Sequence, residues 1–259
     1  MVKLDTQALS GNNQNIVQIE NKAFRPIQYL GSKLRLVNEI SELVELNKTS
    51  NTVCDLFSGS GVVSHYLANN NDVISLDIQY YSTVISEALT NGSQLVDSEI
   101  ENFILEAISN PDYLELKYAY EPLTILEDSL LNTKLITESD KVKFANFTEE
   151  CSIYSYLNTT SKTKLNNVDL NNALDEFHKR YVWLSNNIKK ISYCSLYFGG
   201  VYFSFNQSLI IDALLVKINE LKIVDRPKYS VLLASLLSTL SEIVATVGKQ
   251  FAQPMKLID

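Results

Sequence analysis

Apolar residues recur along much of this chain at the spacing expected of amphipathic helices. The segments with this pattern are 34–46, 97–109, 111–131 and 168–190. Two longer patterns follow, one starting near Gln207 and one running from about Lys228 to Phe251 with a wide apolar face. A face of that width needs another element to pack against. The number of such segments predicts a mainly helical protein.

Two short apolar runs interrupt the helical pattern and predict buried strands, at 52–54 and at 73–76. Each run is followed by a predicted helix, over 62–68 and over 82–89. Strand and helix in this alternation form the front half of a doubly wound α/β sheet. A further stretch, 196–203, is aromatic and predicts a short hairpin or an extended loop.

These changes in character divide the chain into four predicted parts. They are a polar arm over 1–24, an α/β part over 25–95, a helical insert over 96–195 and a carboxyl-terminal helical part over 196–259. Polar loops separate the helices of the insert, and no internal repeat is found in the sequence.

Composition narrows the classes to which the protein can belong. The 259 residues carry a net charge of −8, which argues against a chain that grips nucleic acid over most of its surface but leaves room for one local basic face. Three scattered cysteines and two distant histidines give no metal-ligand spacing. No uncharged run reaches the roughly 18 residues of a membrane span. We therefore expect a cytoplasmic protein with reduced thiols, no membrane segment and no bound metal.

The candidate chemistry lies in the turn after the first predicted strand, Asp55-Leu56-Phe57-Ser58-Gly59-Ser60-Gly61. Two glycines spaced by one residue let the backbone approach a ligand closely. The second predicted strand ends at Asp77, where a carboxylate can accept hydrogen bonds from a ribose diol. Together the two features predict an adenosine-binding site.

Two cofactor classes fit a glycine turn with a distal acid. A nicotinamide dinucleotide site usually has a third glycine or alanine where this chain has Ser64, and it needs no acid at position 55. S-adenosylmethionine (SAM) carries a charged amino group, which an anion near the turn, here Asp55, can meet. We favour SAM on this ground. A glycine turn without a ligand, with Asp77 as an ordinary solvent-facing strand end, is the remaining interpretation.

A loop upstream of the turn, Tyr29-Leu30-Gly31-Ser32-Lys33, adds a family resemblance. With Asp55-x-Phe57-x-Gly59-x-Gly61 and Asp77, it resembles the opening of the Dam-like DNA adenine methyltransferases, in which such a loop precedes the SAM loop. The close match covers about residues 25–90, with looser similarity over 195–250. The resemblance implies SAM as the cofactor and the following binding residues: Tyr29, Gly31, Lys33, Asp55, Phe57, Gly59, Gly61 and Asp77. Tyr29 and Lys33 would hold the methionine part of SAM, and Asp77 its ribose.

One part of the family pattern is missing from this chain. Such enzymes bind the target adenine with an acid or Asn, two prolines and an aromatic residue, whose ring stacks on the flipped base. This chain has five prolines, and none are adjacent. The stretch Asn110-Pro111-Asp112-Tyr113 is similar only superficially, because no apolar strand precedes it, and it predicts a helix start. We therefore assign no catalytic residue to this chain.

The predicted sheet is incomplete as well. A SAM-dependent methyltransferase sheet has more strands than the two predicted here, and two parallel strands alone cannot bury both faces or satisfy their edges. The remaining strands would be expected beyond the last helix. We therefore expect an α/β fold with a partial Rossmann-like, class I SAM-dependent methyltransferase sheet and a mainly helical insert, completed by a second chain.

The resemblance and the missing loop together imply a split enzyme. The chain would be the SAM-binding subunit of a site-specific DNA adenine methyltransferase from a restriction–modification or related defence system. A partner subunit would supply the catalytic Asp-Pro-Pro-Tyr-type loop, double-stranded DNA would be the substrate, and the chain alone would be inactive. Three rivals remain: a non-catalytic SAM-binding regulatory or scaffolding subunit, a degenerate truncated methyltransferase, and a dinucleotide-dependent enzyme.

Contacts to DNA are sought first in the basic pairs within 158–190, among them His178-Lys179-Arg180 and Lys189-Lys190. Most pairs of this kind are solvated helix faces. An aromatic group has the chemistry to stack on a base, with packing in a core or subunit interface as the alternative. Its members are Tyr197, Phe198, Tyr202 and Phe203.

Overall fold

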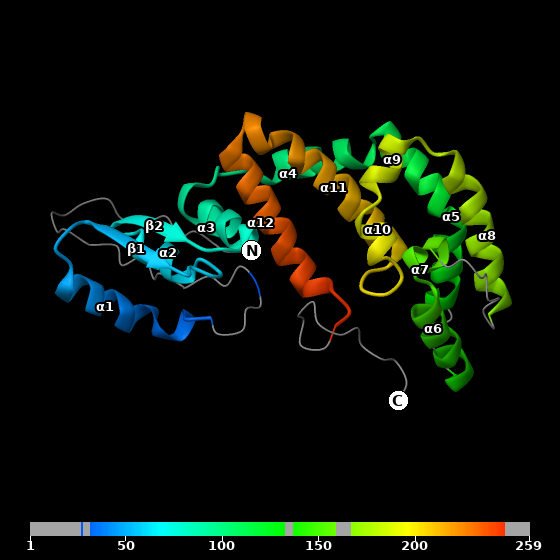
Figure 1. The fold of residues 1–259 in the computed structure, drawn as a ribbon, viewed down its shortest axis with the longest axis horizontal. Coiled ribbons are helices and arrows are strands. Elements are labelled where there is room, and N and C mark those ends of the chain that lie inside the picture. The colour runs from blue at the N-terminus through cyan, green and yellow to red at the C-terminus, as the bar shows by residue number, and fades with distance from the viewer. Residues whose placement is uncertain (1–26, 28–31, 133–136, 159–166, 247–259) are drawn as a thin grey trace, which may run out of the picture.

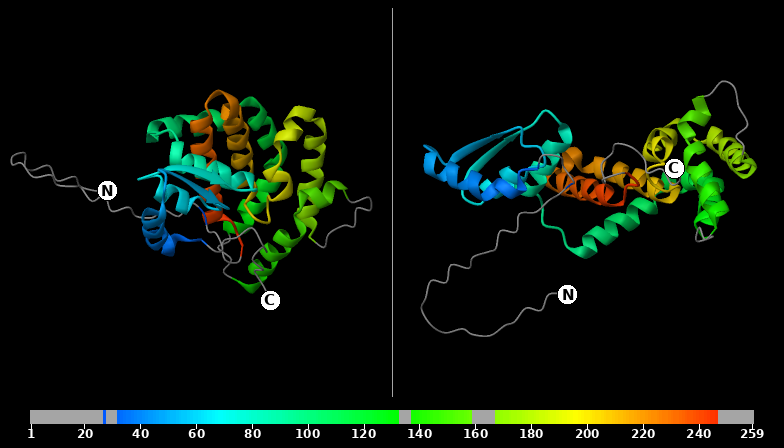
Figure 2. Two further views of the ribbon diagram at one scale, coloured as in Figure 1. Left: turned by 60° about the vertical axis from the view of Figure 1, so that its left-hand side comes forward. Right: turned by 90° about the horizontal axis from the view of Figure 1, so that it is seen from below.

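A computed structural model describes residues 27, 32–132, 137–158 and 167–246 of the chain. The molecule is elongated, with the strands at one end, two long helices in the middle and a cluster of helices at the other end (Figure 1, Figure 2). No helix in the described ranges combines the length and apolar character needed to span a membrane.

The α/β part is built around a parallel pair of strands, β1 (Thr52–Leu56) and β2 (Asp72–Leu76). Helix α2 (Val62–Leu67) lies in the crossover between them, as a parallel connection requires. Helix α3 (Tyr80–Asn91) follows β2, and α1 (Val37–Asn47) packs against α2. The predicted alternation of strand and helix is confirmed.

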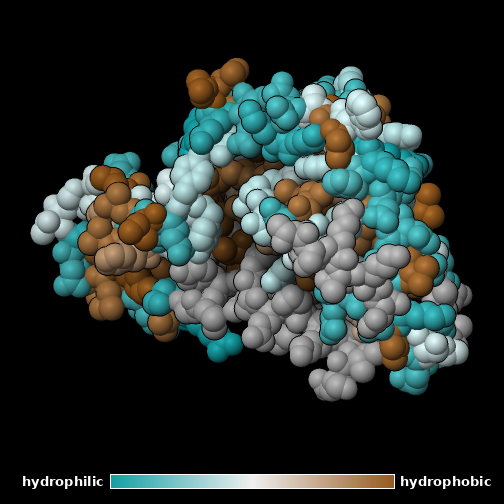
Figure 3. All heavy atoms as spheres, turned by 45° about the vertical axis from the view of Figure 1, so that its right-hand side comes forward, coloured by the Kyte–Doolittle hydropathy of each residue, from teal (hydrophilic) through white to brown (hydrophobic). Residues whose placement is uncertain are grey.

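One face of this sheet has no covering layer among the described residues. The half-buried side chains of both strands alternate with exposed ones, and α2 and α3 contact the strands. On the exposed face the register sets Cys54 beside Ile74 and Leu56 beside Leu76, and Ile74 is 51% exposed. Figure 3 shows hydrophobic residues gathered over this end of the molecule. Parallel sheets are normally covered on both faces, so an exposed apolar face leaves this sheet incomplete.

The helices after the α/β part pack around a core that they share with α11 (Phe205–Val224). They are α4 (Asp97–Ile108), α5 (Pro111–Asn132), α6 (Glu138–Glu150), α7 (Ile153–Asn158), α8 (Val168–Trp183) and α9 (Asn186–Ile191). Fully buried aromatic rings join α5, α6 and α8, with Tyr120 packed edge-on against Phe177 at 4.7 Å between ring centroids and with Phe147 in the same cluster. These helices fall within residues 96–195, and their separation from the rest of the chain as an insert stays a prediction.

Three more helices connect the two ends: α10 (Cys194–Tyr197), α11 (Phe205–Val224) and α12 (Arg226–Ile243). Helix α12 packs along α3, and a β-carbon added at Gly92 would come within 2.3 Å of Val231 Cγ2 in α12. Arg226 Nε donates to both carboxylate oxygens of Glu87 in α3, at 3.0 and 2.8 Å. Close packing and a two-oxygen hydrogen-bond pair therefore fasten the α/β part to the carboxyl-terminal helices.

Two predicted helices differ from the structure in extent. The segment predicted as one helix over 168–190 is two helices, because Leu184 is extended and Ser185 caps α9 by accepting a hydrogen bond from the Ile188 N–H. The last predicted helix ends at Ile243 rather than Phe251, because the chain is extended at Val244. The next N–H, of Ala245, donates to the Tyr202 carbonyl at 3.0 Å.

Two other segments were predicted wrongly or not at all. Helices α6 and α7 had no predicted counterpart; α6 is mostly polar and buries only Ala145 and Phe147, so it carries no clear apolar period. The aromatic stretch near 196–203, predicted as a hairpin or an extended loop, begins with the end of the short helix α10. It continues as a turn with a single bridge between Gly199 and Phe203.

Candidate functional site

The turn between β1 and α2 has a left-handed backbone at three positions. Phe57, Gly59 and Gly61 have φ angles of 64°, 54° and 70°. Glycine adopts this region freely, whereas a bulky residue such as Phe57 does so at a cost of about 1–3 kcal/mol. Strain of this kind is concentrated at ligand-binding and active sites. The backbone of Phe57 therefore supports a functional role for this turn, in addition to the glycine spacing.

Asp77, at the end of β2, is hydrogen-bonded to this turn. The backbone N–H of Gly59 donates to Asp77 Oδ2 at 2.8 Å, and the N–H of Gln79 donates to Oδ1 at 2.8 Å. These bonds, from Gln79 first and then from Gly59, hold the pKa of Asp77 below its usual range. The structure thus brings together two predicted site residues, and it favours an ionised carboxylate at the mouth of the turn.

Asp55, the acid at the start of the turn, is held from the other side. Ser64 Oγ on α2 donates to Asp55 Oδ2 at 2.6 Å, and Ser64 is fully buried. A carboxylate can accept several hydrogen bonds, so this contact orients Asp55 without exhausting its capacity. Ser64 stands where a dinucleotide fingerprint would have a small apolar residue, and its contact with Asp55 accounts for a hydroxyl there.

Gly61 is required by space as well as by backbone angle. A β-carbon at this position would lie 2.8 Å from Ser86 Oγ and 3.1 Å from Ser86 Cα in α3. Ser58 Oγ approaches the same hydroxyl at 3.5 Å, and the Ser58 N–H donates to the Leu76 carbonyl at 3.0 Å. The turn is therefore packed tightly on α3 and on the end of β2.

Two large apolar side chains extend into solvent beside the turn. Phe57, the first residue after β1, is 87% exposed, and Ile78, the second residue after β2, is 97% exposed. In open α/β sheets, ligands bind outside the carboxyl ends of the strands, which is where these side chains lie. Ile78 was not among the predicted site residues. Its signal is an apolar residue between the acid and a polar helix start, a pattern too common to single out from sequence.

The upstream loop is only partly described. Tyr29 and Gly31 lie outside the described residues, so the structure does not place them. Lys33 is exposed and directly precedes a 3-10 turn over Leu34–Leu36, where its carbonyl accepts a 2.8 Å hydrogen bond from the Leu36 N–H. The contact of this loop with the glycine turn stays a prediction.

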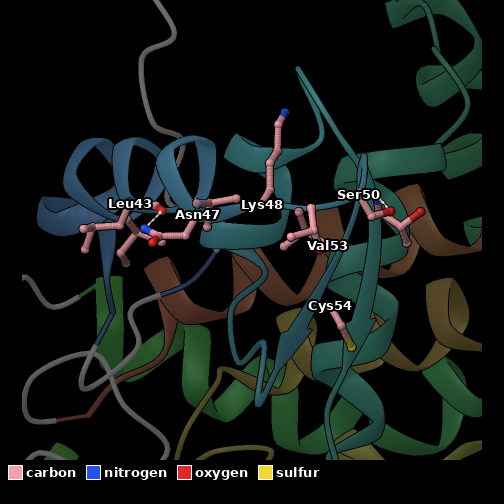
Figure 4. A pocket seen from close by; sticks show the side chains of 10 residues that line it. Leu43, Asn47, Lys48, Ser50, Val53 and Cys54 are labelled. Carbon is pink, nitrogen blue, oxygen red and sulfur yellow. Dashed lines mark hydrogen bonds between the residues drawn. The ribbon is translucent and has the colours of Figure 1, made fainter.

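A groove of about 500 Å³ runs between α1 and β1. Figure 4 shows Leu43 and Asn47 of α1 on one side and Val53 and Cys54 of β1 on the other. Neither β1 nor β2 has a second neighbouring strand in the described ranges, so the groove lies beside a sheet whose edges carry unpaired backbone groups. This part of the molecule is suited to adding further strands.

The stretch Asn110-Pro111-Asp112-Tyr113 lies at the start of a helix. Pro111 is the first residue of α5, Asn110 Oδ1 accepts a 2.8 Å hydrogen bond from the Asp112 N–H, and Tyr113 is buried. This confirms the predicted helix start and leaves Tyr113 unavailable to a base. Within the described residues, no group of three or more His, Cys, Asp or Glu side chains is arranged to hold a metal ion.

Comparison with known families gives a match over most of the chain. The family described as D12 class N6 adenine-specific DNA methyltransferase matches residues 29–208. The matched range includes the upstream loop, the glycine turn, Asp77 and the helical insert. It ends in the first turn of α11, so most of α11 and all of α12 lie outside the matched range.

The curated relatives match shorter segments. The modification methylase LlaI of Lactococcus lactis subsp. lactis is 37% identical over 78 residues, which are 30% of this chain and 12% of that protein. The type II methyltransferase M.NlaIII of Neisseria lactamica is 35% identical over 75 residues, 27% of this chain and 22% of the relative. The type II methyltransferase M.FokI of Planomicrobium okeanokoites is 32% identical over 106 residues, 39% of this chain and 14% of the relative. The chain therefore spans less than a quarter of each relative, and no solved structure matches it.

Proposed function

The chain belongs to the D12 class N6 adenine-specific DNA methyltransferase family, and we propose that it is the SAM-binding subunit of a site-specific enzyme of the restriction–modification type. The reaction would transfer a methyl group from SAM to the amino group of an adenine in double-stranded DNA. The observation that carries this proposal is the bond from the Gly59 N–H to Asp77, which joins the two predicted cofactor elements into one site.

The carboxylates and the apolar side chains at this turn support SAM as the cofactor. Asp77 would accept hydrogen bonds from the ribose hydroxyls while its two backbone donors keep the carboxylate in place. Asp55, oriented by Ser64, would face the charged amino group. The exposed side chains of Phe57 and Ile78 supply apolar surface for the adenine ring.

The upstream loop would complete the cofactor site, with Tyr29, Gly31 and Lys33 at the methionine part. When bound, SAM supplies the methyl group and its positive sulfur. The residues of this chain would hold and orient the cofactor, since alignment of the reacting groups can supply much of the rate. We assign no residue of this chain to contact with the attacking nitrogen.

The proposed second subunit would supply the catalytic loop and the missing strands. The 259 residues contain no adjacent prolines, so an acid–Pro–Pro–aromatic loop is absent from them. The exposed sheet face at Leu56, Ile74 and Leu76 needs a covering layer, and the groove beside β1 offers a place for one. In this arrangement residues 25–95 bind the cofactor, 96–195 contact DNA, and 196–259 contribute to the subunit interface.

A test of the proposal combines the chain with the product of a neighbouring reading frame that carries an acid–Pro–Pro–aromatic loop but no glycine turn of its own. Titration calorimetry should show SAM binding that Asp77→Asn weakens, and transfer of labelled methyl groups to DNA should require both chains. A monomer that methylates DNA unaided would overturn the split arrangement. A single reading frame joining this chain to such a loop would do the same.

A second candidate function follows from the same missing loop. The chain could serve as a SAM-binding regulatory or scaffolding subunit of a complex that does not methylate DNA. Both functions predict SAM binding, so the methyl-transfer assay on the assembled pair separates them. Labelled DNA favours the enzyme, and bound SAM without labelled DNA favours the scaffold.

A further inference from the structure

A row of aromatic side chains lies partly in solvent at the helical end of the molecule. We call it the aromatic row, and its members are Tyr154, Tyr193, Tyr197, Phe198 and Tyr202. Neighbouring ring centroids in the row are 4.9 Å (Tyr154 and Tyr197), 5.1 Å (Tyr193 and Tyr197), 6.2 Å (Tyr193 and Phe198) and 5.7 Å (Phe198 and Tyr202) apart. Tyr193 is 60% exposed, Tyr154 and Tyr197 are exposed, and the other two rings are half-buried behind them.

A buried carboxylate fixes the backbone at Tyr193, where the segment 193–205 begins. Asp212 in α11 is almost completely buried and accepts hydrogen bonds from the N–H groups of Tyr193, Cys194 and Ser195, at 3.1, 2.6 and 2.9 Å. A buried carboxylate is tolerated only when it is hydrogen-bonded in this way. The start of α10, and with it the base of the Tyr193 ring, is therefore held in one position.

The carboxyl-terminal end of the segment 193–205 is also fixed by a buried carboxylate. Glu127 in α5 is buried and accepts a 2.7 Å hydrogen bond from the Phe205 N–H. Between the two ends, Gly200 has a φ of 76°, and a β-carbon there would lie 2.4 Å from Cys151 Sγ. Two buried acids and a tightly packed glycine thus determine the path of a segment whose outer rings are left in water.

Large exposed rings on a rigid frame indicate a binding surface, because the core does not need them. Four of the five members of the row are tyrosines, and Tyr193 follows two residues after the end of α9, whose last turn carries Lys190. Aromatic rings of this kind bind single-stranded nucleic acid by stacking, since every base presents a flat face.

We propose that the aromatic row is a stacking platform for a base that has left the DNA stack. This proposal rests on the proposed function, because an enzyme that methylates an adenine amino group must take that adenine out of the duplex. The target adenine would go to the catalytic loop of the partner. The row would then receive a base left unpaired by that step, the one opposite or beside the target, and would do so with little preference for sequence.

The test uses the full chain and a single-stranded oligonucleotide of mixed sequence containing 5-bromodeoxyuridine. Fluorescence anisotropy gives the affinity, and ultraviolet cross-linking followed by mass spectrometry gives the contact residues. We expect cross-links at Tyr193 or Tyr197. The double variant Tyr193→Leu/Tyr197→Leu should weaken binding by about 5- to 150-fold, whereas Tyr193→Phe/Tyr197→Phe should keep most of the affinity.

The matched control is Ile223→Ala, which removes another highly exposed apolar side chain, near the end of α11 and outside residues 96–195, and should leave the affinity unchanged. Equal affinity of the folded leucine variant and the unsubstituted chain would overturn the proposal, as would cross-links confined to residues outside the row. If the leucine variant fails to fold by circular dichroism, the cross-link map of the unsubstituted chain decides alone. Calorimetry with SAM reports separately on the proposed function: a chain that cross-links through the row but binds no SAM refutes that function and not the platform.

Discussion

The N–H of Gly59 and the carboxylate of Asp77 form a 2.8 Å hydrogen bond that joins the ends of β1 and β2. The bond makes the acid at the end of one strand part of the turn that follows the other. A change at either residue therefore alters both halves of the candidate cofactor site.

Asp77→Asn should weaken SAM binding by about 10- to 150-fold, because the amide has one acceptor oxygen in place of two and must turn its NH₂ group toward a backbone donor. The lowered pKa of Asp77 also predicts a pH dependence. Binding that relies on the ionised carboxylate should persist below the usual range for Asp and be lost as the pH falls through the lowered value.

Calorimetry over a range of pH measures both effects. The control is Asp72→Asn, which changes an exposed acid at the start of the same strand and should leave affinity unaltered. Equal loss in the two variants would show that net charge, rather than the position of Asp77, governs binding.

Gly61→Ala should lower the free energy of unfolding by about 1–3 kcal/mol, because it combines a left-handed backbone with a β-carbon 2.8 Å from Ser86 Oγ. Urea denaturation followed by circular dichroism measures the change. The control is Asn70→Ala, at an exposed position shortly after α2, the helix that Gly61 precedes, and it should be close to neutral. An alanine variant as stable as the original chain would contradict the packing described for this turn.

Glu127→Gln should change how stability depends on pH. Burial raises the pKa of Glu127 to about 7, against the opposing hydrogen bond from Phe205 and with a smaller contribution from Asp128. The folded state therefore holds the proton more tightly than the unfolded state. The stability that this group contributes is complete below its ordinary pKa and is lost as the pH rises toward about 7.

The free energy of unfolding should accordingly fall by up to about 3 kcal/mol between about pH 5 and about pH 7, and Glu127→Gln should flatten this slope. Burial also raises the pKa of Asp212, to about 6, so part of the slope at lower pH remains in the variant. Urea titrations at several pH values provide the measurement. An unchanged slope above about pH 6 would refute the assignment to Glu127.

The Arg226–Glu87 pair should contribute measurably to stability. Arg226 donates to both oxygens of Glu87, and the side chains are 34% and 24% exposed. A double-mutant cycle with Arg226→Met and Glu87→Gln should give a coupling of about 1 kcal/mol after solvent screening is allowed for. The exposed pair Lys141 and Glu138 is the control, and its coupling should stay below about 0.5 kcal/mol.

Ile74→Asp should abolish association with the proposed partner while leaving the isolated chain folded, because Ile74 lies on the uncovered face of the sheet. Size-exclusion chromatography of the co-expressed chains measures association. Ile125→Asp is the control, since Ile125 is comparably exposed but lies on α5, in the helical insert. Association that survives Ile74→Asp would show that the partner binds elsewhere.

The elements set by local sequence were predictable. The turn at Gly59 and Gly61 and the acid at Asp77 could be located because each sits at a fixed offset from an apolar strand. Pro111 marked the start of α5 for a different local reason, since the missing N–H of proline costs nothing at a first helical position. The roles of the site residues stay predictions, and the second subunit does too.

What could not be predicted depends on contacts distant in sequence. The strain at Phe57 and the exposure of Ile78 follow from how the two strand ends meet, which no single stretch encodes. Helix α12 was expected to continue past Ile243, but the hydrogen bond from Ala245 to Tyr202 accompanies an extended chain there. Helix α6 was missed because its stability comes from Phe147 in a core shared with α5 and α8.

The two-stranded sheet has a consequence for how the protein would be made in a cell. Both of its strands are edge strands among the described residues, and exposed edges with an apolar face are templates for aggregation. If a second subunit covers them, the concentration of uncovered chain is set by the ratio of the two gene products. Overproducing this chain alone would then yield insoluble protein, and balanced synthesis would keep it in solution.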